Sequence, residues 1–276
     1  MKQVTLLGSF CLVTASIIAA LPVKFYAMSD GPVGTNERMH FASQIRDLDT
    51  RAEFAIHLGD SHERQKMCNN DLLQQAADTM QTNSLIPVLM VPGANDYYEC
   101  ENQMEAWEAW AHHFLGFEGN WTQSFTLVRQ NGRPENFAFV LKNILFLGVH
   151  VINASVTDWD SLNKLVHDDA VWLEESVLAH SDEVGIIVIL AHAFPHIRRY
   201  REFYDTLVRI TFKYSQKPFL YLQGDGKGFD VEHIFPSQNV LRVVMDPMGS
   251  MDPTEITVDP TNTDSPFKIK RRALKP

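Results

Sequence analysis

An apolar run that leads directly into a polar loop forms the central motif of this sequence: Glu53-Phe54-Ala55-Ile56-His57-Leu58-Gly59-Asp60-Ser61-His62-Glu63. The first six residues have the length and apolar content of a buried strand, and the glycine marks its end. The next three residues bring a carboxylate, a hydroxyl and an imidazole together. Because open α/β sheets bind ligands beyond the carboxyl ends of their strands, this loop is expected to line a binding site.

The same strand, loop and helix pattern recurs on both sides of this motif. Apolar strands are predicted at 23–28 and 86–91, and apolar residues at helical spacing predict helices over 36–50 and 71–81. Each unit takes about 30 residues, the usual size of a βαβ step with a right-handed crossover. The first half of the chain therefore predicts a parallel sheet.

The second half of the chain departs from this pattern. A polar break at Lys142-Asn143 between two apolar runs predicts an antiparallel hairpin. Strands are predicted at 136–141, 144–151, 184–191, 218–222, 239–245 and 255–258, with helices over 159–180 and 199–214. Because no helical span separates the last three strands, the second half predicts a second sheet that is mixed or antiparallel. Two mixed sheets packed face to face and flanked by helices give an α/β fold of four layers, α/β/β/α.

Composition limits the class of protein. With 276 residues, 45% of them hydrophobic, the chain can bury a full core, and residues 22–260 are expected to form one domain. A net charge of -10 excludes a general nucleic-acid binder, which needs a basic face for phosphate contacts. Residues 261–276 are expected to be a short, solvated basic tail, because they contain the basic segment Lys268-Ile269-Lys270-Arg271-Arg272.

The N-terminus has the features of a signal peptide over residues 1–20. Lys2 is its only charge, an uncharged apolar run follows, and cleavage is expected just after Ala20. An uncleaved signal anchor is the alternative, because the run is close to the roughly 20 residues that a spanning helix needs. The protein is therefore expected in the secretory lumen or outside the cell, with no membrane contact beyond this segment.

Two cysteines remain after the leader, Cys68 and Cys100, and each follows a strand-end loop. In an oxidising compartment such a pair is expected to form a disulfide, whereas a cytosolic location would favour two unpaired buried thiols. The triplets at Asn120 and Asn153 match the N-glycosylation sequon, which matters only in a eukaryotic host.

Polar side chains follow five of the predicted strands, and the residues in question are Asp30, Asp60, Asn95, His192 and Asp225. Carboxylate, amide and imidazole groups that converge on one cleft suit a divalent cation such as Mn, Fe or Zn. Each also has a simpler interpretation. A strand-end Asp can cap the next helix, a His after an apolar strand can be a core group, and an Asp between two glycines can be a turn residue.

Taken in order, these motifs resemble those of the calcineurin-like metallophosphoesterases, which read D-x-H, G-D-x-x-D/E, G-N-H-D/E, a lone His and G-H-x-H. The matching segments are Asp30-Gly31-Pro32, Gly59 to Glu63, Gly93-Ala94-Asn95-Asp96, His192 and Gly224-Asp225-Gly226-Lys227. The resemblance extends from about Lys24 to Val258. It implies a hydrolase that uses metal-activated water on a small phosphate ester.

Departures from the family pattern bear on the number of metal ions. Pro32 and Lys227 replace two histidines of one metal site, and neither side chain can ligate a metal, so that site is expected to be empty or weakly occupied. The resemblance implies a second site formed by Asp60, Asn95 or its shifted equivalent, His192 and Asp225, and thus one cation per chain. Ala94 occupies the register of the family's asparagine. Either a one-residue slip brings Asn95 to the metal, or Asn95 replaces the family's catalytic histidine.

Three functions remain open at this stage. In a hydrolase, His62 would protonate the leaving oxygen and Lys227 would bind a phosphate oxygen, and the family pattern places Asp30 among the metal ligands. The alternative is a catalytically inactive protein of this fold that binds a ligand or a partner. The third is a structural domain whose carboxylates only cap helices. Bound metal separates the third from the others, and metal-dependent turnover separates the first two.

Overall fold

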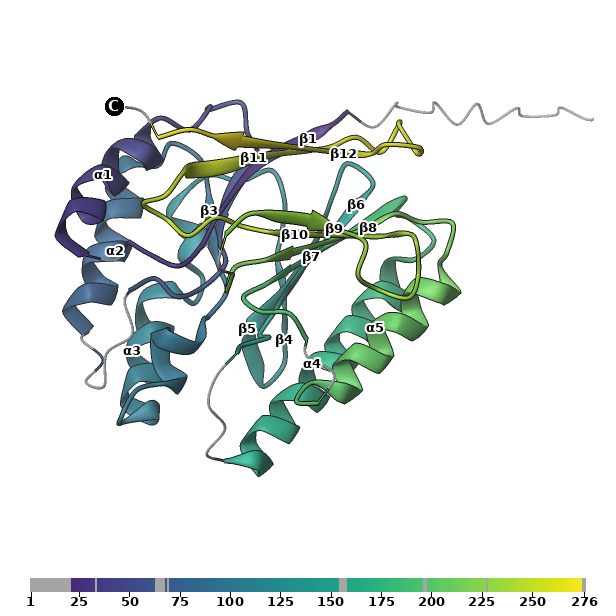
Figure 1. The fold of residues 1–276 in the computed structure, drawn as a ribbon, viewed down its shortest axis with the longest axis horizontal. Helices are drawn as coiled ribbons and strands as arrows, with labels where there is room; N and C mark the ends of the chain where they lie inside the picture. The colour runs from purple at the N-terminus through teal and green to yellow at the C-terminus, as the bar shows by residue number, and fades with distance from the viewer. Residues whose placement is uncertain are drawn as a thin grey trace, which may run out of the picture.

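Two β-sheets lie face to face between two groups of helices (Figure 1). The computed structural model describes residues 21–32, 34–62, 68, 70–153, 158–195, 198–226 and 228–274. The four layers confirm the predicted α/β/β/α fold. The predicted signal peptide, Glu63 and Lys227 lie outside the described residues. Among the helices in the described part of the chain, none has the length and apolar character that crossing a membrane requires.

The first sheet has the strand order β12-β11-β1-β2-β3. Its centre is the predicted parallel unit of β1 (Val23–Met28), β2 (Phe54–His57) and β3 (Val88–Met90). The outer face of this sheet packs on three helices, α1 (Gly34–Arg46), α2 (Asn70–Asn83) and α3 (Gln103–Phe114). A short π-helix, η1 (Ala94–Tyr98), follows β3, and a 3-10 helix, η2 (Phe117–Asn120), follows α3.

The second sheet has the order β4-β5-β6-β7-β8-β10-β9 and is mixed, as expected. Its parallel centre is β6 (Ile144–Val149), β7 (Ile186–Ala191), β8 (Phe219–Gln223) and β10 (Val240–Val244). Antiparallel strands complete its edges: β4 (Val128–Gln130), β5 (Arg133–Leu141) and β9 (Asp230–Glu232). Helices α4 (Trp159–His180) and α5 (Arg201–Lys213) cover its outer face (Figure 1).

Two expectations about the C-terminal region were wrong. The strand predicted at 255–258 belongs to the first sheet, where β11 (Asp252–Val258) pairs antiparallel with β1. The expected solvated tail instead contains the edge strand β12 (Phe267–Arg272), which pairs with β11. The physical reason is that β1 has an unpaired edge on the side away from β2, and backbone N–H and C=O groups at that edge need partners.

Side-chain alternation along the central strands separates the core into layers. In β7, Ile186, Val188 and Leu190 face the first sheet, whereas Ile187 and Ile189 face α4 and α5. This period-two pattern in a strand buried on both faces is typical of parallel sheets covered on both sides. The predicted hairpin at Lys142-Asn143 is also confirmed, since both residues have positive φ, of 49° and 67°, as a tight two-residue turn between β5 and β6 requires.

Phenylalanine rings fill the space between the two sheets. The Phe54 ring on β2 stacks on Phe25 at a centroid distance of 4.8 Å and meets Phe146 of the opposite sheet edge-on at 5.3 Å. Phe146 in turn stacks on Phe139 at 4.9 Å. Phe54 therefore connects the sheets at the start of β2, the strand that leads into the loop carrying Asp60.

We expect Phe54→Ala to destabilise the protein by about 3–5 kcal/mol, because the Phe54 side chain is fully buried and its removal leaves a cavity between the sheets. The free energy of unfolding from urea denaturation measures the effect. Phe212→Ala is the matched control, because Phe212 is 56% exposed and should lose less than about 0.5 kcal/mol. Equal losses in the two variants would contradict the proposed role of the ring cluster.

Candidate metal centre

Asp30 and Asp60 are the residues at which the chain leaves β1 and β2 for the loops above them. Both have positive φ, 54° and 57°, which is uncommon for residues other than glycine. Backbone hydrogen bonds connect the two loops: the Asp30 N–H donates to Gly59 O at 3.1 Å, and the Gly31 N–H donates to Asp60 O at 2.7 Å. The loops of two adjacent parallel strands thus present both carboxylates at the same edge of the sheet.

Glycine is required where the strand-end loops touch. A Cβ on Gly93 would lie 2.1 Å from Asp60 Oδ1, and a Cβ on Gly59 would lie 2.6 Å from the Gly93 nitrogen. The loop after β8 is equally close, since a Cβ on Gly224 would lie 2.8 Å from Leu58 O. Any side chain at these positions would separate the loops that form the site.

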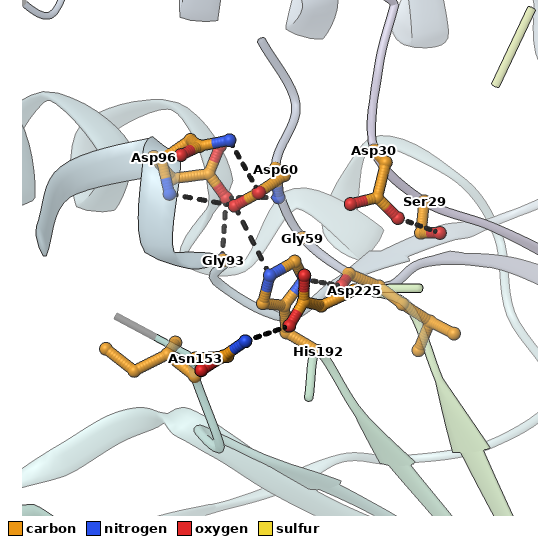
Figure 2. Close-up of polar contacts among 12 residues, drawn as sticks. Ser29, Asp30, Gly59, Asp60, Gly93, Asp96, Asn153, His192 and Asp225 are labelled. Carbon is orange, nitrogen blue, oxygen red and sulfur yellow. Dashed lines mark hydrogen bonds and ion pairs between the residues drawn. The ribbon is translucent and has the colours of Figure 1, made fainter. Parts of the chain in front are cut away.

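His192 follows β7 and completes a group of three possible ligands with Asp30 and Asp60, whose ligand atoms all lie within 4.8 Å of one another (Figure 2). The ring nitrogen Nδ1 donates to Leu58 O at 2.8 Å, so Nε2 carries the lone pair. Nε2 lies 3.4 Å from Asp60 Oδ1, is buried and has no hydrogen-bond partner. A histidine that donates one ring N–H to a backbone carbonyl and has no hydrogen-bond partner at the other ring nitrogen has the arrangement of a metal ligand.

The electrostatics of the group also fit a cation. Burial, assisted by the charges of Asp96 and Asp30, raises the pKa of Asp60 to about 7, although His192 opposes the shift. Burial likewise raises the pKa of Asp30. Burial alone would lower the pKa of His192, but the negative charges of Asp60, Asp30 and Asp225 outweigh it, and the pKa is raised. Burial thus disfavours the charged forms of both carboxylates, and a bound divalent ion would favour them.

Asn95 contacts the carboxylate of Asp60 through both its backbone and its side chain. Its backbone N–H donates to Asp60 Oδ1 at 2.8 Å, and Nδ2 donates to Asp60 Oδ2 at 2.7 Å. Ala94, in contrast, is buried among apolar residues that contact the second sheet. The residue shifted by one position is therefore the one that faces the candidate metal centre, and it orients the Asp60 carboxylate.

Asp96 is a central residue of the site to which the sequence analysis gave no role. Its side chain is fully buried and accepts hydrogen bonds from the N–H groups of Gly93, Asp60 and Ser61, at 2.7, 3.0 and 2.8 Å, and from the Ser61 hydroxyl at 2.7 Å. Burial raises its pKa, but the charge of His62 and these hydrogen bonds lower it further, so the pKa lies below its usual value. Its position directly after Asn95 in a strand-end motif is the signal that could have identified it.

Further contacts hold η1, which carries Asn95 and Asp96, against the second sheet. His150 Nδ1 donates to Glu135 Oε1 at 3.0 Å, and His150 Nε2 therefore accepts from the Tyr97 hydroxyl at 2.9 Å. On the other side, the disulfide between Cys68 and Cys100 confirms the predicted pairing, and both sulfur atoms lie 3.8 Å from Asn95 O. The π-helix is thus fixed from two directions.

The remaining predicted residues lie beside the group of three. Asp225 follows β8, and its Oδ2 accepts from Asn153 Nδ2 at 2.8 Å, so its carboxylate lies near His192 but does not belong to the group within 4.8 Å found among the described residues (Figure 2). His62 is buried and lines a cavity of about 200 Å³, together with Pro32 and Ser61 and with residues of α1 and α2. Lys227 is outside the described residues.

Comparison with known proteins supports the fold. No family model and no curated protein matches the sequence. Among solved structures, GAP50 of Plasmodium, described as the anchor in the inner membrane complex, matches with a TM-score of 0.52 at 10% identity, over 93% of this chain and 90% of its own. A 5'-nucleotidase from Candida albicans SC5314 matches with a TM-score of 0.53 at 15% identity, over 90% of this chain. This chain spans 50% of the nucleotidase chain. The fold is therefore metallophosphatase-like.

We expect Asp96→Asn to destabilise the protein by about 3 kcal/mol at pH 7, because an amide nitrogen would face N–H donors that now bind a buried carboxylate. Since the folded-state pKa of Asp96 is lowered, its stabilisation is present above the unfolded value of about 3.9 and is lost as the pH falls below it. Urea denaturation at several pH values measures both effects.

The control for this variant is Asp205→Asn, which removes a carboxylate that is 57% exposed in a surface ion pair with Arg201. It should change the free energy of unfolding by less than about 1 kcal/mol. A difference between the wild-type protein and Asp96→Asn that stays constant from pH 7 to below about pH 4 would contradict the assigned role of Asp96.

Proposed function

We propose that this chain hydrolyses phosphate esters with one divalent cation, Mn, Fe or Zn, held by Asp30, Asp60 and His192. The observation that carries the proposal is the bare, buried Nε2 of His192, which lies 3.4 Å from an Asp60 oxygen in a group of three ligand atoms. Imidazole and carboxylate ligands suit these metals. The metallophosphatase-like fold and the likeness to a 5'-nucleotidase support a small phosphorylated substrate.

Each residue of the chain has a distinct part in the proposed reaction. When bound, the cation lowers the pKa of water and neutralises charge on the transferred phosphoryl group. Asn95 holds both oxygens of Asp60 in place, and Asp96 fixes the loop that carries Asp60. The order of the motifs assigns Asp225 to the metal and Lys227 to a phosphate oxygen. His62 is proposed as the acid for the leaving oxygen.

The proposal also includes the location of the protein in an oxidising compartment. The Cys68–Cys100 disulfide is expected to persist outside the cytosol, and it agrees with a signal peptide over residues 1–20 that precedes a phosphoesterase domain over 22–260. The predicted location is thus secreted or within the secretory lumen. The alternative is a protein anchored to the membrane by an uncleaved signal segment.

A ligand-binding or partner-binding protein without turnover is the second candidate. Pro32 stands where the family has a metal-binding histidine, and Ala94, where the family has an asparagine, is buried in the apolar core. The likeness to GAP50, described as an anchor, also favours a binding role. A protein that binds metal but shows no metal-dependent turnover would support this candidate.

We expect Asp60→Asn and His192→Ala each to lower bound metal and to reduce kcat/KM for an aryl phosphate at least about a hundredfold, because each removes a ligand of the one proposed cation. Elemental analysis of the purified protein and assays across Mn, Fe and Zn provide the two measurements. Asp205→Asn is the control and should match the wild-type protein in both. Wild-type protein without bound metal in any of these conditions would rule out the hydrolase.

A further inference from the structure

A pocket of about 390 Å³ lies where the loops after β6, β7 and β8 meet, directly beside the candidate metal centre. Its lining residues are Asn153, Phe194, Arg198, Arg199, Gln223 and Asp225. Asp225 belongs to both sites: its carboxylate lies near His192 (Figure 2), and the residue also lines the pocket. A group bound in the pocket would therefore be a neighbour of a phosphoryl group at the cation.

Hydrogen bonds order the wall between the pocket and the metal centre. The amide of Asn153 donates through Nδ2 to Asp225 at 2.8 Å and accepts through Oδ1 from Arg199 Nη1 at 3.4 Å. Only one side-chain amide thus separates the guanidinium of Arg199 from the carboxylate beside His192. Two side chains, those of Asn153 and Asp225, therefore connect Arg199 to the edge of the candidate metal centre.

The opposite wall is held by a third arginine. The Arg242 guanidinium lies 5.0 Å from the centroid of the Phe194 ring, and its Nε donates to Gln223 Oε1 at 2.8 Å. Phe194 and Gln223 line the pocket, and Arg242 also forms an ion pair with Glu232 outside it, so this wall is ordered before any ligand binds.

The charge of the pocket is opposite in sign to that of the chain as a whole. Its lining residues carry two guanidinium groups, Arg198 and Arg199, against the single carboxylate of Asp225, although the whole chain has a net charge of -10. Arginine binds phosphate oxygens through paired N–H donors, which makes it the usual residue for phosphate recognition. The pocket therefore favours an anion over a neutral or cationic group.

We propose that this pocket binds the second phosphate of a diphosphate, with Arg198 and Arg199 as its ligands, while the terminal phosphate lies at the metal centre. The inference rests on the proposed function and names its substrate class. In the reaction, water adds to the terminal phosphorus and the bond to the bridging oxygen breaks. The leaving phosphate keeps the bonding electron pair in the pocket, orthophosphate forms, and one proton passes to solvent.

The first test measures binding to the metal-free full-length chain by isothermal titration calorimetry, with inorganic pyrophosphate and inorganic orthophosphate as the probes. We expect pyrophosphate to bind at least about tenfold more tightly, because it offers the two guanidinium groups more negative charge and more acceptor oxygens than orthophosphate does. The double variant Arg198→Gln/Arg199→Gln should lose this preference. Arg201→Gln is the matched control: Arg201 belongs to a surface ion pair, does not line the pocket and should leave the affinity unchanged.

Two outcomes would overturn the subsite: equal affinity for the two probes in the wild-type protein, or wild-type pyrophosphate affinity in the double variant. A second measurement separates this proposal from the proposed hydrolysis. The ratio of kcat/KM for a nucleoside diphosphate to that for the monophosphate, on metal-loaded protein, should fall at least about tenfold in the double variant. If the protein hydrolyses monoesters but pyrophosphate binding does not depend on the two arginines, only the subsite is refuted. If pyrophosphate binding depends on the arginines but no substrate is hydrolysed, only the hydrolysis is refuted.

Discussion

Contact between the loops after β2 and β3 is the constraint on which the rest of the site depends. Gly93 has no side chain at the point where a Cβ would lie 2.1 Å from Asp60 Oδ1, so the two backbones can approach. Only at that distance can Asp96 accept the N–H groups of Asp60 and Ser61, and only then can Asn95 reach the Asp60 carboxylate. A side chain on Gly93 would therefore disturb the orientation of Asp60 as well as the local backbone.

Neighbouring carboxylates in this site have opposite electrostatic roles. Asp96 is surrounded by N–H and O–H donors, and its pKa is lowered, so it stays charged as a fixed anchor for the loops. Within the part of the chain that the structure describes, the Asp60 carboxylate accepts hydrogen bonds from Asn95 alone. It lies near two other carboxylates, which together with burial raise its pKa to about 7. The anchor is satisfied by the protein itself, whereas Asp60 gains most from an added positive charge, as a metal ligand should.

Local sequence patterns were sufficient for much of this structure and insufficient where tertiary pairing decides. The apolar run before Asp60 and the turn at Lys142-Asn143 predicted their elements, because strand length and turn chemistry are local properties. The place of β11 in the first sheet was mispredicted, since a strand pattern does not specify which free sheet edge it joins. The role of Asp96 was also not predicted, because three of its four donors come from a loop more than thirty residues earlier in the chain.

Pro32 and the arginine pocket can be understood together. Two cations would neutralise more of the negative charge on a transferred phosphoryl group than the single cation of the proposed function. Pro32 cannot ligate a metal, so under that proposal part of the phosphoryl group's negative charge needs another counter-charge. Arg199 supplies positive charge one amide away from Asp225, and Arg198 lines the same pocket, where the leaving phosphate of the proposed diphosphate would lie. Such charge stabilises a leaving group that is itself anionic more than it stabilises a neutral alcohol. With the single cation of the proposed function, the arginines would therefore favour diphosphates over esters of neutral alcohols.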